Sequence, residues 1–165
     1  MIAPHKAVFL DRDGVINRER GEHTWELADF EVLPDVPGTI ARLRDLGYLC
    51  IVISNQSGIG MGLYSHVQVE ALHDYLHHHL DQYGTRLDAI YYCPHHPSRG
   101  RCLCRKPGGL LLERAIARYG IDPTLSLLVG DRERDVEAAR SVGVRGILVR
   151  ANSPLRDALT SAAIL

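Results

Sequence analysis

Short apolar runs alternate along the chain with segments in which apolar residues recur at helical spacing. Runs that are this short, apolar almost throughout and rich in Val, Ile and Leu are typical of strands buried on both faces of a parallel sheet. They predict five strands, at residues 6–10, 48–53, 87–92, 125–129 and 146–149.

Helices are predicted between these strands. Val69, Leu72 and Leu76, for example, are spaced so that they share one helix face. Glycines that suit a helix C-terminus, such as Gly47 and Gly120, mark where these segments stop. The predicted helices are 36–46, 66–83, 110–119 and 133–142. Strands and helices in this order predict a doubly wound α/β fold, in one domain covering 1–165.

Composition excludes several classes of protein. The chain has 165 residues, of which 45% are hydrophobic and 24% charged, which is ordinary for one globular domain. A net charge of -1 provides no general field for nucleic acid or acidic lipid. No apolar run approaches the roughly 18 residues that span a bilayer, and the first residues do not resemble a signal peptide. We therefore expect a cytoplasmic protein without nucleic-acid or membrane partners.

Polar residues follow three predicted strands at or near their ends: Asp11, Ser54 and Asp131. The carboxyl ends of strands in an open parallel sheet form the ligand crevice, so these residues should converge. Asp11, Asp13 and Asp131 together provide the oxygen ligands that Mg²⁺ prefers. Two alternatives without a metal remain open for these aspartates. The first pair could be solvated groups of a turn, and Asp131 could cap the following helix.

Two further segments suit phosphate. Residues 54–58, Ser-Asn-Gln-Ser-Gly, combine a hydroxyl, amides and exposed main-chain N–H groups. Arg105 and Lys106 add two cations in a loop. Each segment alone is weak evidence, because such loops are common turns and such cations are commonly solvated.

Three of the four cysteines lie within twelve residues, which favours metal ligation in a reducing compartment. A Cys-x-His pair and a Cys-x-Cys pair supply four zinc ligands, Cys93, His95, Cys102 and Cys104. Four protein ligands leave no position for a catalytic water, so the zinc should be structural and hold the loop before Arg105. A disulfide among these cysteines is the alternative. Cys50 is predicted to be a small core residue, and His77–His79 a solvated helix face.

Together these segments resemble the phosphatase branch of the haloacid dehalogenase superfamily. The resemblance covers residues 6–150 and is tightest to the D-glycero-D-manno-heptose 1,7-bisphosphate phosphatases. The intervals between the motifs are too short for a large cap domain. Such enzymes feed lipopolysaccharide or other surface polysaccharides. The segments that carry it are 9–17 (Phe-Leu-Asp-Arg-Asp-Gly-Val-Ile-Asn), 54–58, 92–97 (Tyr-Cys-Pro-His-His-Pro), 102–107 (Cys-Leu-Cys-Arg-Lys-Pro) and 129–131 (Val-Gly-Asp).

The resemblance implies a role for each matching residue. Asp11 is the implied nucleophile, and Asp13 the implied general acid and base. Asp11, Asp131 and the main-chain carbonyl of Asp13 are the implied Mg²⁺ ligands. The implied contacts to phosphate and substrate are Ser54, Asn55, Gln56, Ser57, Arg105, Lys106 and Arg132, together with a substrate loop at Glu19, Arg20, Gly21 and Glu22.

Asp13 has to give a proton to the leaving group, so we expect its pKa to lie above the usual value of about 4. The chain departs from the family at Val15, at residues 60–62 and at residues 107–110. The last two departures lie near the mouth of the site and bear on specificity rather than on the reaction.

The implied substrate is a small phosphorylated sugar, and we expect a monomer. A histidinol-phosphate phosphatase, or a phosphatase for another small sugar phosphate, is the first alternative. A nucleic-acid 3′-phosphatase is disfavoured by the charge balance. A zinc-organised binding module that performs no catalysis is disfavoured by the intact pair Asp11 and Asp13, because a binder needs no nucleophile.

Overall fold

The chain folds around a sheet of five parallel strands in the order β3-β2-β1-β4-β5. This computed structural model describes residues 3–165. The central strand β1 has the predicted bounds, and the strands are β1 (Lys6–Leu10), β2 (Tyr48–Asn55), β3 (Ala89–Cys93), β4 (Leu127–Gly130) and β5 (Arg145–Leu148). The order confirms the doubly wound parallel arrangement.

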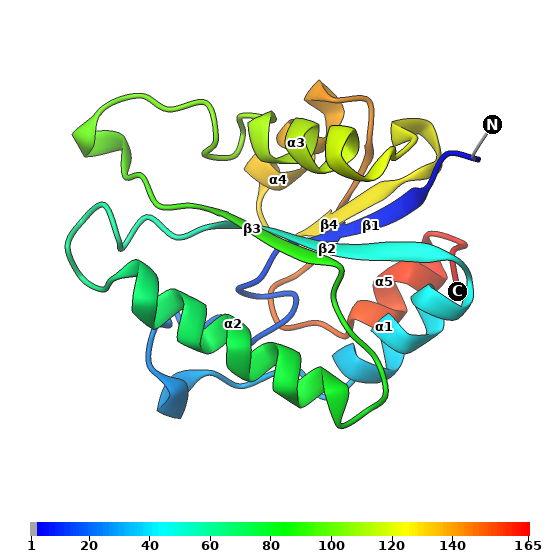
Figure 1. The fold of residues 1–165 in the computed structure, drawn as a ribbon, viewed down its shortest axis with the longest axis horizontal. Coiled ribbons are helices and arrows are strands. Elements are labelled where there is room, and N and C mark those ends of the chain that lie inside the picture. Colours follow the sequence, from blue (N-terminus) through cyan, green and yellow to red (C-terminus); the bar gives the residue numbers. More distant parts are fainter. Residues whose placement is uncertain (1–2) are drawn as a thin grey trace.

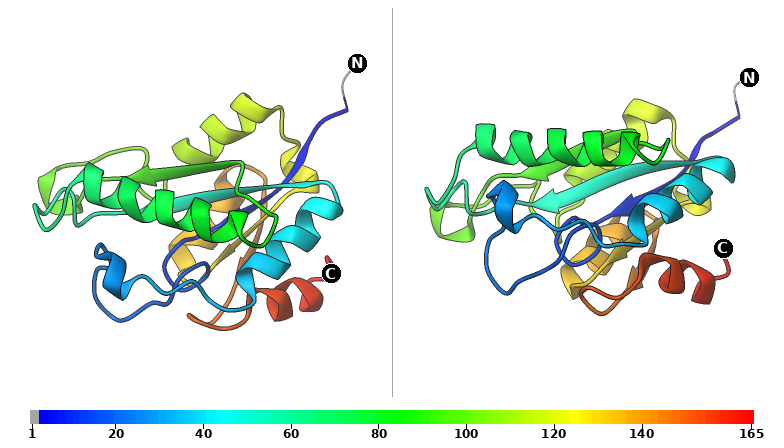
Figure 2. Two further views of the ribbon diagram at one scale, coloured as in Figure 1. Left: turned by 60° about the horizontal axis from the view of Figure 1, so that its bottom comes forward. Right: turned by 90° about the horizontal axis from the view of Figure 1, so that it is seen from below.

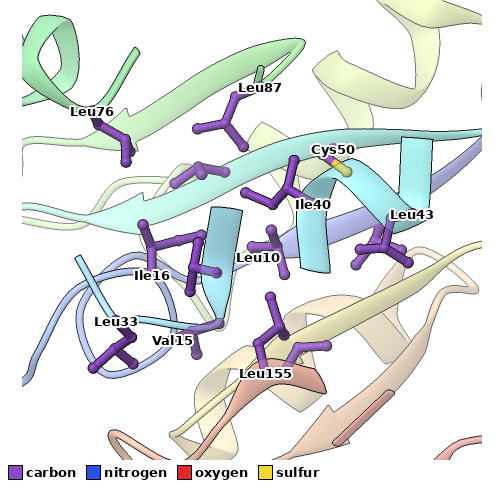
Figure 3. Packing of buried hydrophobic residues seen from close by; sticks show 14 of the residues in the cluster. Leu10, Val15, Ile16, Leu33, Ile40, Leu43, Cys50, Leu76, Leu87 and Leu155 are labelled. Atoms are coloured by element: carbon purple, nitrogen blue, oxygen red, sulfur yellow. The ribbon is translucent and has the colours of Figure 1, made fainter. Parts of the chain in front are cut away.

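Helices cover both faces of the sheet (Figures 1 and 2). One face carries α3 (Leu110–Tyr119) and α4 (Glu133–Ser141); the other carries α1 (Val36–Asp45), α2 (His66–Asp81) and α5 (Leu155–Ser161). Because strand residues alternate between faces, Val8 and Leu10 pack toward α1, α2 and α5, whereas Ala7 and Phe9 pack toward α3 and α4. Figure 3 shows part of the first of these two cores.

Some boundaries differ from the predicted ones for local reasons. β4 begins at Leu127 rather than at residue 125, because Pro123–Leu125 form a 3₁₀ turn and the Asp122 side chain caps this turn at the N–H of Thr124. β3 begins at Ala89 rather than at residue 87, and Ser54 lies inside β2 rather than after it. Helix α5 was not predicted.

The prediction for Cys50 is confirmed, since its side chain lies in the core with no exposed area. None of the helices in residues 3–165 is both long and apolar enough to cross a membrane.

The pairing of β1 brings the predicted polar residues to one edge of the sheet. Leu10, the last residue of β1, is opposite Val52 of β2 and Val129 of β4. The residues that follow these three partners therefore meet at the carboxyl ends of neighbouring strands, as in other open α/β sheets.

Candidate active site

Asp11 lies directly after β1 and is almost fully buried. Its main-chain N–H donates to the carbonyl of Val129 at 3.0 Å, which extends the pairing of β1 with β4 by one residue. The ammonium group of Lys106 lies 2.9 Å from Asp11 Oδ1 and also donates to the carbonyl of Ile53 at 2.7 Å. Lys106 is itself buried, so its charge acts at short range on Asp11.

Three carboxylates gather around this point: Asp11, Asp131 and Asp135 offer oxygens within 4.8 Å of one another. Burial, the nearby Asp135 and Asp13 raise the pKa of Asp11 to about 7, although Lys106 opposes the rise. Burial also raises the pKa of Asp131. A bound cation would offset the repulsion between these carboxylates, and oxygen donors are the ligands that Mg²⁺ prefers.

Gly14 makes room for this cluster. A Cβ atom at position 14 would lie 2.6 Å from Asp131 Oδ2, and the backbone there has a φ of +88°. A side chain is therefore excluded both by the neighbouring carboxylate and by the left-handed backbone. A glycine is thus required after Asp13 partly because Asp131, which is distant in the sequence, lies beside this position.

Asp135 is a site residue that the sequence reasoning missed. It is completely buried, lies 2.7 Å from the Lys106 ammonium, and accepts a hydrogen bond from the N–H of Arg132 at 3.0 Å. The cap interpretation of Asp131 is therefore wrong: Arg132 occupies the N-cap of α4, and Asp135 bonds back to it. An acid in the first helical turn after Asp131 was the only available signal.

The Asp13 carboxylate lines the same pocket but is not a member of this cluster. Its Oδ1 accepts hydrogen bonds from Arg12 at 2.9 Å and from Asn17 at 3.0 Å, and its Oδ2 accepts one from Gln56 at 3.1 Å. Burial favours a raised pKa for Asp13, but the Arg12 charge and these hydrogen bonds outweigh it. The pKa is lowered, so the expectation of a raised value is wrong for the free protein.

Segment 54–58 holds the loop that carries Lys106. The Asn55 side chain donates to the Lys106 carbonyl at 3.2 Å and accepts from the Lys106 N–H at 3.0 Å. Ser54 is fully buried and accepts a hydrogen bond from Gln56 at 2.8 Å. Asn55, Gln56 and Ser57 line the pocket beside Asp11. The amide of Asn55, predicted to contact substrate, is thus already bonded to main chain.

The predicted substrate loop lies across the same pocket, which it lines with Glu19, Gly21 and Glu22. Arg20 instead pairs with Glu22 at 3.3 Å and Asp29 at 3.2 Å, and is not among the lining residues. The loop is held from outside, because Asn152 accepts from the N–H of Glu19 at 2.7 Å and donates to its carbonyl at 3.0 Å.

Arginines also line the pocket. Arg132 and Arg134 line it, and Arg105 lies close enough to Arg134 that burial and this like charge lower the pKa of Arg105. Arg105 Nη1 and Arg134 Nε are buried, and neither has a hydrogen-bond partner within residues 3–165. Guanidinium groups in this situation suit an anionic ligand. Arg134 was not predicted.

The pocket measures about 460 Å³. The residues that line it are Asp11, Asp13, Glu19, Gly21, Glu22, His23, Thr24, Asn55, Gln56, Ser57, Asp131, Arg132 and Arg134. His23 and Thr24 extend the predicted loop by two residues.

The predicted zinc ligands converge in the loop between β3 and α3. Cys93 Sγ lies 2.9 Å from Cys104 Sγ and 3.7 Å from Cys102 Sγ, and His95 Nδ1 lies 3.2 Å from Cys104 Sγ. Bonds of about 2.0–2.3 Å to a tetrahedral zinc place ligand atoms roughly 3.3–3.8 Å apart, so the last two separations fit a zinc site and the first is shorter. The cysteines are not paired in disulfides. His96 turns away and bonds Ser98 instead.

Known proteins resemble the chain over nearly its full length. Residues 103–164 match the HAD-hydrolase-like family. D-glycero-beta-D-manno-heptose-1,7-bisphosphate 7-phosphatase from Haemophilus ducreyi is 41% identical over 88% of this chain and 83% of its own length. The chain belongs to this family of HAD-like phosphatases. A relative from Photorhabdus laumondii that acts on the alpha anomer is 38% identical over 92% of this chain and 86% of its own.

A solved structure of the family has the same fold. The D,D-heptose 1,7-bisphosphate phosphatase of B. bronchiseptica, complexed with magnesium and phosphate, superposes with a TM-score of 0.84 at 35% identity. The match covers 94% of this chain and 86% of that one. The predicted superfamily, the α/β fold and the assignment as a phosphatase are therefore confirmed, and a binding module without catalysis is excluded.

Proposed function

We propose that this phosphatase removes the 7-phosphate of D-glycero-D-manno-heptose 1,7-bisphosphate through an aspartyl-phosphate on Asp11, in the biosynthesis of heptose for lipopolysaccharide or other surface polysaccharides. The observation that carries the mechanism is the pairing of buried Asp11 with Lys106 at the edge of a pocket that also holds Asp13 and two arginines. The relatives described above support the choice of substrate.

In the first half of the reaction, an Asp11 carboxylate oxygen attacks phosphorus and the bond to the sugar oxygen breaks. Lys106 offsets part of the charge on Asp11 and on the transferring phosphoryl group. Asp13 gives its proton to the departing sugar oxygen. A phosphate dianion beside Asp13 raises the pKa of this acid by like-charge repulsion, which supports protonation once substrate is bound.

In the second half, water attacks the phosphorus of the aspartyl-phosphate and loses a proton to Asp13. The bond from phosphorus to Asp11 breaks, and inorganic phosphate leaves. The lowered pKa of Asp13 suits this half, because the group has to be ionised to accept a proton. Hydrogen bonds from Asn17 and Gln56 hold the ionised carboxylate in place.

Mg²⁺ fits the acidic cluster, and Asp11 and Asp131 would hold it together with the main-chain carbonyl of Asp13. When bound, the ion supplies positive charge that lets an anionic carboxylate approach an anionic phosphate. Asp135 is less suited to ligation, since Lys106 and the N–H of Arg132 already bind its oxygens.

The rest of the pocket suits the second phosphate and the sugar. Arg132 and Arg134 line the pocket, and Arg105 lies beside Arg134, so these three arginines offer cations for an anionic group away from Asp11. The acidic residues Glu19 and Glu22 repel phosphate and suit the hydroxyl groups of a sugar, which donate hydrogen bonds to carboxylates. A bisphosphorylated sugar meets both requirements.

Substrate preference tests this assignment. We expect kcat/KM for at least one anomer of the heptose bisphosphate to exceed that for histidinol phosphate at least 100-fold, and activity to need added Mg²⁺ after treatment with chelator. Comparing both anomers also decides which one the enzyme takes. A higher kcat/KM for histidinol phosphate would instead establish the first alternative.

We also propose that Cys93, His95, Cys102 and Cys104 bind a structural zinc that holds the loop before Lys106. Binding of zinc by a loop this short contributes directly to its folding. We expect about one zinc per chain in the wild type and much less in Cys104→Ser. We also expect this variant to have a lower kcat/KM, because Arg105 and Lys106 directly follow the lost ligand. Metal analysis and kinetics at several Mg²⁺ concentrations measure both effects.

The matched control is Cys50→Ala, which removes a cysteine outside the cluster and should keep its zinc. The apparent Mg²⁺ affinity of Cys104→Ser should stay near that of the wild type. A variant without zinc but with full activity would show that the loop does not position these cations, and a wild-type protein without zinc would remove the assignment altogether.

A further inference from the structure

Two buried side-chain connections link the Asp13 carboxylate to the loop segment His23–Trp25. The first runs through Arg12, whose Nη2 donates to Asp13 Oδ1 at 2.9 Å and to the main-chain carbonyl of Thr24 at 2.8 Å. The Arg12 side chain has no exposed area, and within residues 3–165 its Nε and Nη1 have no hydrogen-bond partner. One nitrogen of a buried guanidinium thus carries both contacts.

The second connection reaches the other carboxylate oxygen. Gln56 Nε2 donates to Asp13 Oδ2 at 3.1 Å, and Gln56 Oε1 accepts from the Tyr64 hydroxyl at 2.8 Å. The Tyr64 ring stacks on Trp25, with centroids 6.2 Å apart, and meets the edge of His23 at 5.8 Å. The two middle members of this connection, Gln56 and Tyr64, are buried.

Gly58 is what allows Tyr64 to lie here. A Cβ atom at position 58 would lie 2.0 Å from Cε1 of the Tyr64 ring. The glycine that the sequence suggested for phosphate binding thus has a second use, which is close packing of Tyr64 beside Gln56.

Burial of the Arg12 guanidinium costs desolvation free energy, so stability alone does not explain its contact with Asp13. A buried ion pair contributes little to stability relative to apolar residues of similar volume, because both charges are taken from water. Arg12 nevertheless pairs with Asp13, whose side chain is 24% exposed, and also holds the main-chain carbonyl of Thr24. Such a pair restricts the orientation of the carboxylate, and orientation matters most for a group that has to transfer a proton.

We propose that Arg12 and the pair Gln56–Tyr64 are positioning residues that make the orientation of the Asp13 carboxylate depend on the position of segment 23–25. Because His23 and Thr24 line the pocket, a substrate that contacts this segment also fixes the orientation of the Asp13 carboxylate. The inference rests on the proposed role of Asp13 as general acid and base, and it extends that role to the substrate loop.

The test is the dependence of kcat/KM on the leaving group, measured from nitrophenyl phosphates to alkyl phosphates. This constant covers the steps up to departure of the leaving group, and a nitrophenolate leaves without a proton whereas an alkoxide needs one. Tyr64→Phe removes only the hydroxyl that donates to Gln56. We expect it to lower kcat/KM for alkyl phosphates by roughly tenfold, a part of the 10²–10⁴-fold that general acid–base groups contribute.

The same variant should lose less activity toward nitrophenyl phosphates, so that the dependence on the leaving group becomes steeper. Arg12→Lys keeps the charge but offers no planar guanidinium for both acceptors, and it should steepen the dependence as well. If thermal unfolding shows that Arg12→Lys does not fold, Tyr64→Phe decides the question alone. Tyr83→Phe, at an exposed tyrosine beyond α2, is the control and should match the wild type.

Asp13→Asn separates this inference from the role on which it rests. If Asp13→Asn does not steepen the dependence, then Asp13 is not the acid. The other contrary outcome is that Asp13→Asn steepens the dependence while Tyr64→Phe either lowers kcat/KM equally for all leaving groups or leaves it unchanged. In that case the positioning role is wrong, and the role of Asp13 as general acid is kept. Trp25→Leu tests the loop, because it leaves both sets of hydrogen bonds in place; an unchanged dependence in that variant excludes coupling to segment 23–25.

Discussion

Asp11→Asn is expected to abolish turnover of every phosphate ester while the protein stays folded. The amide is not a usable nucleophile, and it replaces a carboxylate that lies against Lys106 and lines the pocket. The shape of the side chain is kept, and its oxygen can still accept from Lys106. We therefore expect the free energy of unfolding to change by no more than about 1 kcal/mol, the net value of one hydrogen bond.

Steady-state kinetics and urea unfolding of the same preparation measure the two effects. Asp157→Asn, at a solvent-exposed aspartate of α5, is a control for the chemical change alone. Activity near that of the wild type in Asp11→Asn would mean that another group attacks phosphorus. A large loss of stability would mean that the charge of Asp11 holds the fold together, which its raised pKa argues against.

Lys106→Met is expected to remove activity and also to destabilise the protein by about 3–5 kcal/mol, the usual cost of leaving a buried ion pair without one partner. Lys106 lies 2.9 Å from Asp11 and 2.7 Å from Asp135, so its loss leaves both carboxylates without their buried cation. Urea unfolding at pH 7 measures this loss.

The dependence on pH follows from the sign of the shift. The pKa of Asp11 is raised above its unfolded value even with Lys106 present. An acid of this kind favours the folded state at low pH, where it is protonated, and this contribution is lost as pH rises through the unfolded and then the folded pKa. The defect of Lys106→Met should therefore be largest at pH 7 and above and shrink toward pH 4.

Adding Asp11→Asn to Lys106→Met provides the decisive comparison. The double variant lacks one of the two carboxylates that the single variant leaves uncompensated, so it should recover part of the lost stability. If the defect is the same at every pH and Asp11→Asn recovers nothing, packing around the Lys106 methylene groups rather than its charge explains the loss.

The fold could be predicted because its signal is local and strong. β1 and α3 have the predicted bounds, since each is an apolar run or stripe that ends at a charged residue or a glycine. Helix α5 was missed because seven residues are too few to show a period, and Leu155 and Leu159 acquire their role only by packing into the core beside α1. Position relative to other elements is not visible in so short a segment.

The site could be predicted where the chain concentrates its chemistry, as at Asp11 and Asp131 or in the zinc cluster, whose members converge as expected. It could not be predicted where a contact depends on distant elements. Asp135 reaches Lys106 from the first turn of α4. Against the effect of burial, the pKa of Asp13 is lowered first by the charge of its neighbour Arg12, and the hydrogen bond from Gln56, which comes from another strand end, adds to this effect.

Asn152 has a consequence for exchanging specificity between relatives. Its side-chain amide bonds both main-chain polar groups of Glu19, much as a neighbouring strand would, and its own N–H donates to the carbonyl of Gly14. The substrate loop is thus one part of a two-part unit whose other part follows β5. A loop taken from a relative and grafted onto this scaffold keeps its shape only if residues 150–153 are transferred with it.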